Sequence, residues 1–327
     1  MRVMAQGFAL SALFFLLAGS MSRTQTSETD GPLAAGRQHV MIRSTRDNSL
    51  QPSYIIVPPA YNANSAPAPL IVALHTWNFD IERQRFQEFE AGAARHNWIY
   101  LFPNFRGVND HPEACGSEVA QQDILDAVAW TQVHLKVDDK RIYLWGWSGG
   151  GHMALLLAAR SPDIWAAVSA WAGITDMAAY YREQDRTTQS QLRACMGGAP
   201  GASPAVDSQY RERSSLTSLA TAANLPIDIW NGRDDDDVSP RHAMLAFNKL
   251  AEAKNSPQIS SEEIAQLTRL GGTLDRPQPG DQVSDAALGR TIFLRRAAGP
   301  SRVTVYEGGH MTVAAPTFDW FEKHIRP

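Results

Sequence analysis

The sequence predicts an α/β protein with a doubly wound, mostly parallel sheet, and three observations favour this class. Continuous apolar runs such as 70–77 and 98–103 are typical of strands buried on both faces of a parallel sheet. Segments with helical character, at 82–97 and 120–134, alternate with these runs along the chain. With 327 residues, 44% of them hydrophobic and 20% charged, the chain is long enough for one large domain with a sizeable core.

We expect eight strands, with helices between them along the chain. A hairpin-like pair of strands comes first, and the later strands are separated by stretches long enough for a helix. The expected strands are 39–44, 53–57, 70–77, 98–103, 141–146, 165–171, 226–232 and 302–306. The further helices are expected directly after Ser148 and at 239–253, 261–270 and 318–325.

Two long segments lack a strong apolar period and are expected to be insertions in a single catalytic domain over 39–327. The first, 174–222, is predicted to form a cap or lid over the carboxyl end of the sheet. The second, 256–290, is polar and is predicted to be peripheral.

Residues 1–22 are predicted to be a secretory signal peptide, because Arg2 precedes a short apolar run and the small residues Ala18 and Ser20 follow it. The run is shorter than the roughly 20 apolar residues that a spanning helix needs. An uncleaved anchor is the alternative, and a lipoprotein is disfavoured because no Cys follows the run. We therefore expect a secreted or periplasmic protein with a flexible leader at 23–38 and no stable membrane span once the signal is cleaved.

The charge and the cysteines narrow the possible partners. A net charge of −4 provides no basic surface, so no nucleic-acid partner is expected. Potential ligands do not occur at metal-site spacing, so neither a metal nor a cofactor is predicted. Cys115 and Cys195 both fall in loops at the carboxyl end of the sheet, and a disulfide between them is expected in an oxidising compartment; two unrelated buried thiols are the alternative. The sequence gives no indication of the oligomeric state.

The pattern Gly-Trp-Ser-Gly-Gly at 146–150 predicts a serine nucleophile on a sharp turn between a strand and a helix. Apolar residues lead up to Gly146, and an Ala/Leu-rich segment with helical propensity follows Ser148 at once. Such a turn lifts the hydroxyl clear of the backbone, and the small residues on either side avoid clashes across the turn. Without this context the pattern is only moderately specific.

A serine hydroxyl becomes a good nucleophile when an imidazole takes its proton and a carboxylate orients that imidazole. On this kind of turn the acid and then the histidine follow the serine in the chain. The loop at 233–238 offers four aspartates, of which Asp235 is preferred, with Asp236 and Asp237 as the main alternatives. His310 is the preferred base because it follows a strand and two glycines, whereas His242 and His324 fall in predicted helices and are expected to be exposed.

The oxyanion that forms during acyl transfer needs backbone N–H donors, and Gly149 and Trp77 are the candidates. Trp147 and Arg106 are the candidates for the substrate pocket, and His152 is interpreted as a packing residue. Aromatic side chains stack on sugars and aromatic acyl groups, so esters of plant polysaccharides are a reasonable substrate class. Burial of Trp147 beneath the turn is the alternative.

These motifs together resemble the α/β-hydrolase superfamily, and in particular the catalytic domain of the prolyl oligopeptidase family. The resemblance extends from Leu70 to the C-terminus and also includes single-domain, dienelactone-hydrolase-like esterases. The motifs that carry it are Asn-Phe-Arg-Gly at 104–107, Asp123, Val137-Asp138, Arg141-Ile142, the pattern at 146–150, Gly232 to Val238, and Gly309-His310. The resemblance implies that Ser148, Asp235 and His310 form a catalytic triad.

The chain departs from the family pattern at three places. Asn231 and Gly232 stand where the family has His-Gly, and Val238-Ser239-Pro240 stands where it has Val-Pro. His75-Thr76 stands where a His-Gly pair usually opens the oxyanion loop, which leaves the second oxyanion donor less well defined than the triad.

Three functions remain open at this point. The first is a serine esterase that acts on a small-molecule or polysaccharide-linked ester through an acyl-enzyme on Ser148. The second is a serine peptidase acting on small peptides; it is disfavoured because the stretch before the first core strand is too short for the N-terminal propeller of the family's peptidases. The third is a non-catalytic binding module, and it is disfavoured because every triad member is present.

Overall fold

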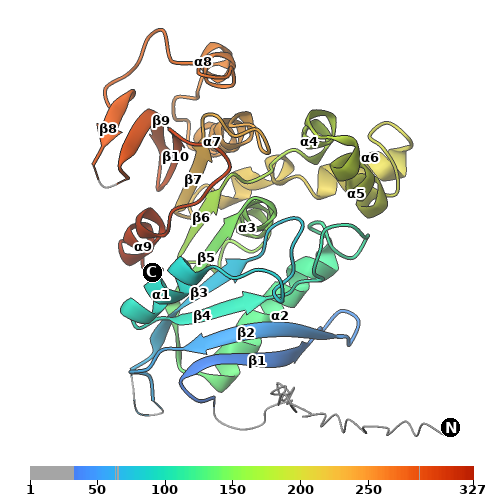
Figure 1. The fold of residues 1–327 in the computed structure, drawn as a ribbon, viewed down its shortest axis with the longest axis vertical. Coiled ribbons are helices and arrows are strands. Elements are labelled where there is room, and N and C mark those ends of the chain that lie inside the picture. The colour runs from blue at the N-terminus through green and yellow to red at the C-terminus, as the bar shows by residue number, and fades with distance from the viewer. Residues whose placement is uncertain (1–32, 63, 65, 287) are drawn as a thin grey trace, which may run out of the picture.

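The computed structural model describes residues 33–327, except 63, 65 and 287 (Figure 1). The expected signal peptide at 1–22 and most of the expected leader lie outside the described residues. The strands are β1 (Gly36–Arg43), β2 (Leu50–Val57), β3 (Ala68–Leu74), β4 (Ile99–Pro103), β5 (Val137–Trp147), β6 (Ala167–Trp171), β7 (Ile227–Gly232), β8 (Val283–Asp285), β9 (Arg290–Ala298) and β10 (Ser301–Tyr306).

All described strands belong to one sheet in the order β1-β2-β4-β3-β5-β6-β7-β10-β9-β8. In this spatial order, the central strands from β4 to β10 pair in parallel. The outer strands at both edges, β1 and β2 on one side and β9 and β8 on the other, pair antiparallel. Strands β3, β6 and β7 are buried along their whole length, as the apolar runs predict. The carboxyl ends of the parallel strands therefore share one edge, where α/β proteins place their sites.

The prediction of eight strands is wrong, because the described sheet has ten. The additional strands, β8 and β9, extend the sheet antiparallel beyond β10, and β8 comes from the segment that was expected to be peripheral. Strand β9 contains several arginines, which interrupt the apolar run that would predict a strand. Arg296 is one of them, and its guanidinium pairs with Asp281 and Glu263, so these charges have partners within the fold.

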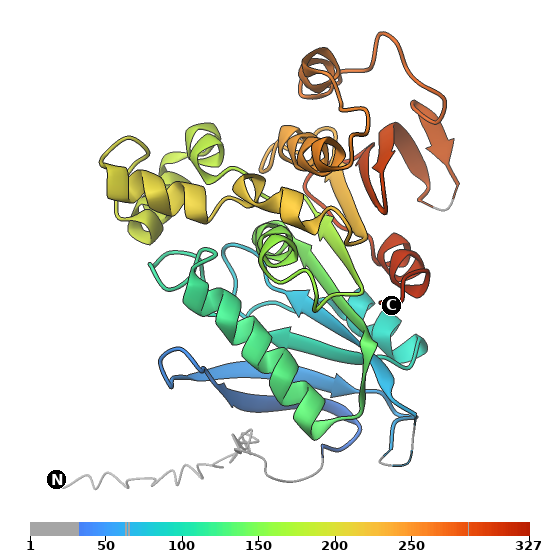
Figure 2. The same cartoon turned by 180° about the vertical axis from the view of Figure 1, so that it is seen from behind.

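Helices cover both faces of the sheet (Figures 1 and 2). One large apolar cluster joins one face to α2, α3, α7 and α8, and a second cluster joins the opposite face to α1 and α9. These helices are α1 (Gln87–Arg95), α2 (Glu118–His134), α3 (Gly149–Arg160), α7 (Arg241–Ala253), α8 (Ser261–Leu267) and α9 (Ala314–Glu322). No helix in the described part of the chain is long and apolar enough to span a lipid bilayer.

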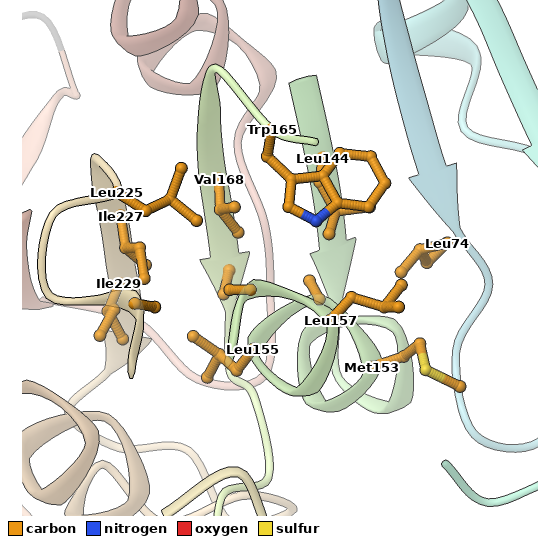
Figure 3. Packing of buried hydrophobic residues seen from close by; sticks show 14 of the residues in the cluster. Leu74, Leu144, Met153, Leu155, Leu157, Trp165, Val168, Leu225, Ile227 and Ile229 are labelled. Atoms are coloured by element: carbon orange, nitrogen blue, oxygen red, sulfur yellow. The ribbon is translucent and has the colours of Figure 1, made fainter. Parts of the chain in front are cut away.

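Helix α3 lies in the centre of the first cluster and presents apolar side chains to several strands (Figure 3). Met153, Leu155 and Leu157 pack among residues of the parallel strands, including Leu144 and Val168. Each fully buried side chain of this size contributes about 1.5–3 kcal/mol to folding. The helix that follows the predicted nucleophile is therefore firmly anchored.

The first insertion forms a helical cap at the carboxyl edge of the sheet (Figure 1). It contains α4 (Met177–Glu183), α5 (Arg186–Met196) and α6 (Pro204–Glu212), followed by short 3-10 turns at Ser215–Thr217 and Leu219–Ala222. The side chains of Asp176, Asp185 and Ser203 cap the three α-helices, which explains why short helices form without a long apolar period. A third apolar cluster joins this cap to the core.

Candidate active site

The predicted site residues follow four of five adjacent parallel strands, at the carboxyl edge of the sheet. Trp77 follows β3, Ser148 follows β5, Asp235 follows β7 and His310 follows β10. Strand order places β3, β5, β6, β7 and β10 side by side, so the fold gathers residues that are far apart in the sequence. The candidate site occupies this edge.

Ser148 has the strained backbone of a nucleophile turn, with φ 59° and ψ −122° between β5 and α3. Its N–H donates to the Trp171 carbonyl at the end of β6 at 2.9 Å, and its carbonyl accepts from the His152 N–H at 2.9 Å. These bonds fix the backbone of the turn, and Ser148 lines a small cavity. The strand–turn–helix arrangement matches the sequence prediction.

The turn has no room for side chains at its glycines. A Cβ added to Gly146 would collide with the Gly150 carbonyl, and one added to Gly150 would collide with the Leu74 carbonyl. A Cβ on Gly149 would lie 2.6 Å from the Trp77 nitrogen. The glycines therefore allow the turn to close and bring the backbone of Gly149 against that of Trp77.

Asp235 and His310 form a buried hydrogen-bonded pair. The His310 Nδ1 atom lies 2.9 Å from Oδ2 and 3.0 Å from Oδ1 of Asp235. The carboxylate side chain is fully buried, and it also accepts the N–H groups of Asp237 and Val238 at 3.0 and 2.8 Å. The Asn231 amide lies 3.3 Å from Oδ2. A carboxylate held in this way fixes the orientation of the imidazole ring.

The neighbouring aspartates are placed differently from Asp235. Asp234 pairs with Arg233 at 2.6 Å and accepts the N–H of Gly271 at 3.2 Å. Asp236 and Asp237 are exposed, and Asp237 lies at the rim of the site. Among the four aspartates of the loop, only Asp235 contacts His310 in the described structure.

Ser148 and His310 line the same small cavity, whose volume is about 200 Å³. The serine hydroxyl and the imidazole do not form a direct hydrogen bond in the described structure, and such contacts often tighten only when substrate binds. The other lining residues are Thr76, Trp77, Asn78, Phe79, Gln84, Trp147, Tyr180, Gln184, Thr188 and Asp237. Trp147 is half-buried and its ring centre is 5.1 Å from that of His310.

The oxyanion loop after β3 is held by a residue that the sequence did not single out. Gln84 accepts the Thr76 N–H at 2.8 Å, and its amide donates to the Thr76 hydroxyl at 2.8 Å. The expected helix at 82–97 begins only at Gln87, because Asp80 caps the N–H groups of Glu82 and Arg83 in a turn. That turn presents Gln84 to the loop.

The Trp77 N–H meets no acceptor among the described residues. Trp77 lines the same cavity as Ser148, and its backbone nitrogen lies against Gly149. Gly149 is the first residue of α3, so its N–H has no acceptor within the helix. Two adjacent backbone donors beside a serine hydroxyl can stabilise a developing oxyanion. His75 sits just before the loop, with its ring stacked on Phe105 and its nitrogens at the Thr76 and Asn104 carbonyls.

Arg106 does not line the cavity, which corrects the prediction that it contributes to the substrate pocket. Its guanidinium binds Asp123 and Asp47 and is largely buried by these contacts. These partners could not be identified from the sequence, because Asp47 lies in the loop after β1 and Asp123 lies in α2. Arg106 instead anchors the loop at 104–107 to the body of the protein.

Two further histidines, His152 and His242, are buried, and their rings make hydrogen bonds to other parts of the fold. His152 lies under the turn and donates from Nε2 to the Arg213 carbonyl at 2.7 Å; its burial lowers the pKa to about 4, so it is neutral. His242 was expected to be exposed on a helix, but it is 2% exposed. Its ring contacts Thr175 and Glu183, which explains its burial.

Cys115 and Cys195 form a disulfide, with Cα atoms 6.2 Å apart. The bond joins the loop after β4 to helix α5 of the cap. The expected pairing is confirmed, although Cys195 lies in a helix and not in a loop. Among the described residues there is no group of three or more side chains arranged to hold a metal ion.

Comparison with known proteins gives one family match. The model of the prolyl oligopeptidase family matches residues 85–263, which is more than half of the chain. Two curated relatives are the uncharacterized peptidase YtmA of Bacillus subtilis, 27% identical over 49% of this chain, and feruloyl esterase B of Talaromyces stipitatus, 26% identical over 57%. The chain spans 60% and 52% of the lengths of these two relatives.

Solved structures show the same fold. The acylaminoacyl peptidase of Pyrococcus horikoshii superposes with a TM-score of 0.57 at 20% identity, over 68% of this chain and 36% of that protein. Dipeptidyl peptidase 4 of Porphyromonas gingivalis superposes with a TM-score of 0.55 at 20% identity, over 68% of this chain and 31% of that protein. With this α/β-hydrolase fold and the family match, the chain belongs to the prolyl oligopeptidase family of serine hydrolases.

Proposed function

We propose that the protein hydrolyses carboxylic esters through an acyl-enzyme formed on Ser148. The observation that carries the proposal is the meeting of a strained serine turn and a carboxylate-held imidazole in one small cavity. Either feature alone occurs in proteins without catalysis. Together they supply the nucleophile, the base and the orienting acid of acyl transfer.

In this mechanism the Ser148 oxygen attacks the ester carbonyl while its proton passes to Nε2 of His310. Asp235 stabilises the imidazolium through Nδ1–H. The oxygen of the tetrahedral intermediate accepts hydrogen bonds from the N–H groups of Gly149 and Trp77. The intermediate collapses, His310 returns the proton to the leaving alcohol, and a water activated by His310 then releases the acid and restores Ser148.

Three observations support an ester with a compact aromatic acyl group. The cavity is smaller than the roughly 300–1,000 Å³ of sites that enclose a whole small molecule, so it fits an acyl group whose alcohol part stays outside. Phe79 is 44% exposed beside the cavity, and together with Trp147 it offers an aromatic rim. One relative is a feruloyl esterase. These features favour aromatic acyl esters linked to saccharides.

A serine peptidase of small peptides is the second candidate, and Asp237 favours it. Asp237 lines the cavity, and its carboxylate has no cationic partner among the described residues. A carboxylate in this place can bind the free amino group of a peptide. In that case Asp237→Asn raises KM for aminoacyl substrates and leaves KM for acetyl and feruloyl esters unchanged.

A matched substrate panel tests the proposal. Acetyl, butyryl and feruloyl esters are compared with amides of the same acyl groups, for the wild type and for Ser148→Ala. We expect ester hydrolysis to exceed amide hydrolysis in kcat/KM, and Ser148→Ala to lose about 10⁴-fold or more. Faster cleavage of the amides would favour the peptidase, and no Ser148-dependent cleavage of either class would refute both.

We also propose that the protein works outside the cytoplasm, in an oxidising compartment. The Cys115–Cys195 disulfide supports this, because such bonds persist where thiols are not kept reduced. Thiol titration of unreduced protein from its native compartment, combined with N-terminal sequencing for signal removal, tests the proposal. Two free thiols and an intact N-terminus would contradict it.

A further inference from the structure

Trp77 is held by side-chain amides from two sides. Its carbonyl accepts from the Asn109 N–H at 3.0 Å and from the Asn109 amide at 3.2 Å. Its indole Nε1–H donates to Gln191 at 3.1 Å, and the Gln191 amide donates to Asn78 at 2.9 Å. The backbone and the ring of Trp77 are thus fixed independently.

The two supports belong to the two segments that the disulfide joins. The Asn109 Oδ1 atom accepts the N–H of Cys115 at 2.6 Å, and Cys115 has a left-handed backbone with φ 54°. Gln191 and Cys195 are four residues apart in α5, which places them on the same face of the helix. A chain of contacts therefore runs from each half of the disulfide to Trp77.

This assembly is separate from the two clusters that hold the sheet. Trp77, Cys115 and Cys195 are at most 3% exposed and belong to the third apolar cluster, which joins the cap to the core. The sheet clusters contain none of these three residues. Loosening the third cluster should therefore affect the oxyanion loop before it affects the fold.

We propose that the Cys115–Cys195 disulfide, Asn109 and Gln191 act as one brace that positions the Trp77 N–H for the oxyanion. The brace residues are positioning residues, since they act on the reaction through Trp77. Loss of the brace lowers the stabilisation of the transition state and leaves the binding of the ground-state ester largely unchanged. This inference rests on the proposed esterase function.

The test compares kcat, KM and the affinity for a boronic acid that forms a tetrahedral adduct with the serine. The variants are Asn109→Ala, Gln191→Ala and the double variant Cys115→Ala/Cys195→Ala. Removing a whole oxyanion donor costs about 10²–10³ in kcat, so displacing one should lower kcat about tenfold. The boronic acid affinity should fall with kcat, while KM changes little.

Matched controls separate positioning from general stability. Asn248 braces another loop with the same pair of bonds, to the carbonyl and N–H of Ile259 at 2.8 Å each, so Asn248→Ala controls for Asn109→Ala. Arg193 lies on α5 and bonds the Tyr181 hydroxyl at 2.9 Å, so Arg193→Ala controls for Gln191→Ala. Gln191→Glu keeps the acceptor for the Trp77 indole and should retain most of the turnover.

The outcomes are distinct. A lower kcat with parallel loss of boronic acid affinity in the brace variants, but not in the controls, supports the brace. Unchanged kcat with only a lower melting temperature overturns it. Gln191 is half-buried, so Gln191→Ala keeps the test available if the disulfide variant does not fold. A wild type without Ser148-dependent ester hydrolysis overturns the proposed function itself, and the brace with it.

Discussion

The turn around Ser148 and the loop around Trp77 each offer one backbone N–H to the same cavity, but they are held in different ways. The turn is held by backbone packing, since backbone atoms of neighbouring segments occupy the space where a side chain on any of its glycines would begin. The loop is held by side-chain amides from Gln84, Asn109 and Gln191. Almost any substitution of a turn glycine should therefore disrupt the turn. Each substitution of a loop-supporting amide should instead remove only part of the activity.

The two regions also differ in the origin of their supports. The turn is built from one short segment and its two neighbouring strands. The supports of the loop come from the turn at 80–84, the loop after β4 and the cap helix α5. The cap therefore completes the site as well as covering it.

The largest effect should come from a change that leaves both regions intact. Asp235→Asn preserves the hydrogen bond to His310 but favours the wrong tautomer of the ring, which should lower kcat by about 10⁴-fold. Asp236→Asn, in the same loop, should keep nearly all activity. Steady-state kinetics on a feruloyl or acetyl ester decide this, and equal activity of both variants would remove Asp235 from the mechanism.

Gly150→Ala should break the turn. The added methyl group would meet the Leu74 carbonyl and would lie 2.9 Å from the His75 carbonyl, so both donor regions must move. A displacement of about 1 Å can cost 10²-fold in rate, and overpacking costs about 1–3 kcal/mol of stability. Gly198→Ala, where the nearest atom is the Ala202 methyl group at 3.3 Å, is the control. Similar kinetics and melting temperatures for the two variants would contradict the packing argument.

Each region contains a buried histidine whose pKa is lowered by burial: His152 under the turn and His75 under the loop. The His152 pKa falls from 6.5 to about 4, so between these pH values the unfolded chain binds a proton that the folded chain does not. Stability is therefore full above pH 6.5 and is lost as the pH falls toward 4, by up to about 3 kcal/mol.

His152→Gln tests this pH dependence, because the glutamine amide can still donate to the Arg213 carbonyl. Urea unfolding at pH 7 and at pH 4.5 should show a smaller loss of stability in the variant than in the wild type. His75 also titrates with a lowered pKa, so part of the acid sensitivity should remain. An equal loss in both proteins would show that His152 is not the group responsible.

The smallest effect is expected for Gln84→Ala, which removes two hydrogen bonds from Thr76. Each typical hydrogen bond contributes about 1 kcal/mol, and only part of this energy acts on the transition state, because the rest orders the loop in the free enzyme. We therefore expect kcat to fall about tenfold, with little change in KM. Gln84→Glu keeps an acceptor for the Thr76 N–H and should lose less. Gln132→Ala, which removes an exposed side chain paired with Asp139, is the control. A rise in KM alone would instead make Gln84 a substrate-binding residue.

The parts of the site that local sequence dictates were predictable. The turn at Ser148 requires glycines at fixed positions, and His310 follows a strand at the sheet edge, so both could be identified from short patterns. The strands β3 to β7 and β10 could be predicted because burial on both faces leaves continuous apolar runs. The cap could be located, although not its helices, because their capping residues stabilise short segments without an apolar period.

The parts that depend on distant partners were not predictable. Strand β9 could not be predicted because its arginines make the segment polar. Arg296 is accommodated in the sheet because it pairs with Asp281 and Glu263, which are distant in the sequence. Arg106 looked like a pocket residue because its partners, Asp47 and Asp123, lie far from it in the sequence. Gln84 contacts Thr76 because residues 80–84 form a turn and α1 begins only at Gln87. The helix expected from residue 82 gave no reason to assign Gln84 this contact.

The most direct test of the central claim, a Ser148 nucleophile activated by His310 and Asp235, is mass spectrometry after treatment with a fluorophosphonate. The wild type should gain one adduct, on the peptide that contains Ser148, and Asp235→Asn should gain it far more slowly. No adduct on the wild type, or an adduct on another residue, would contradict the account.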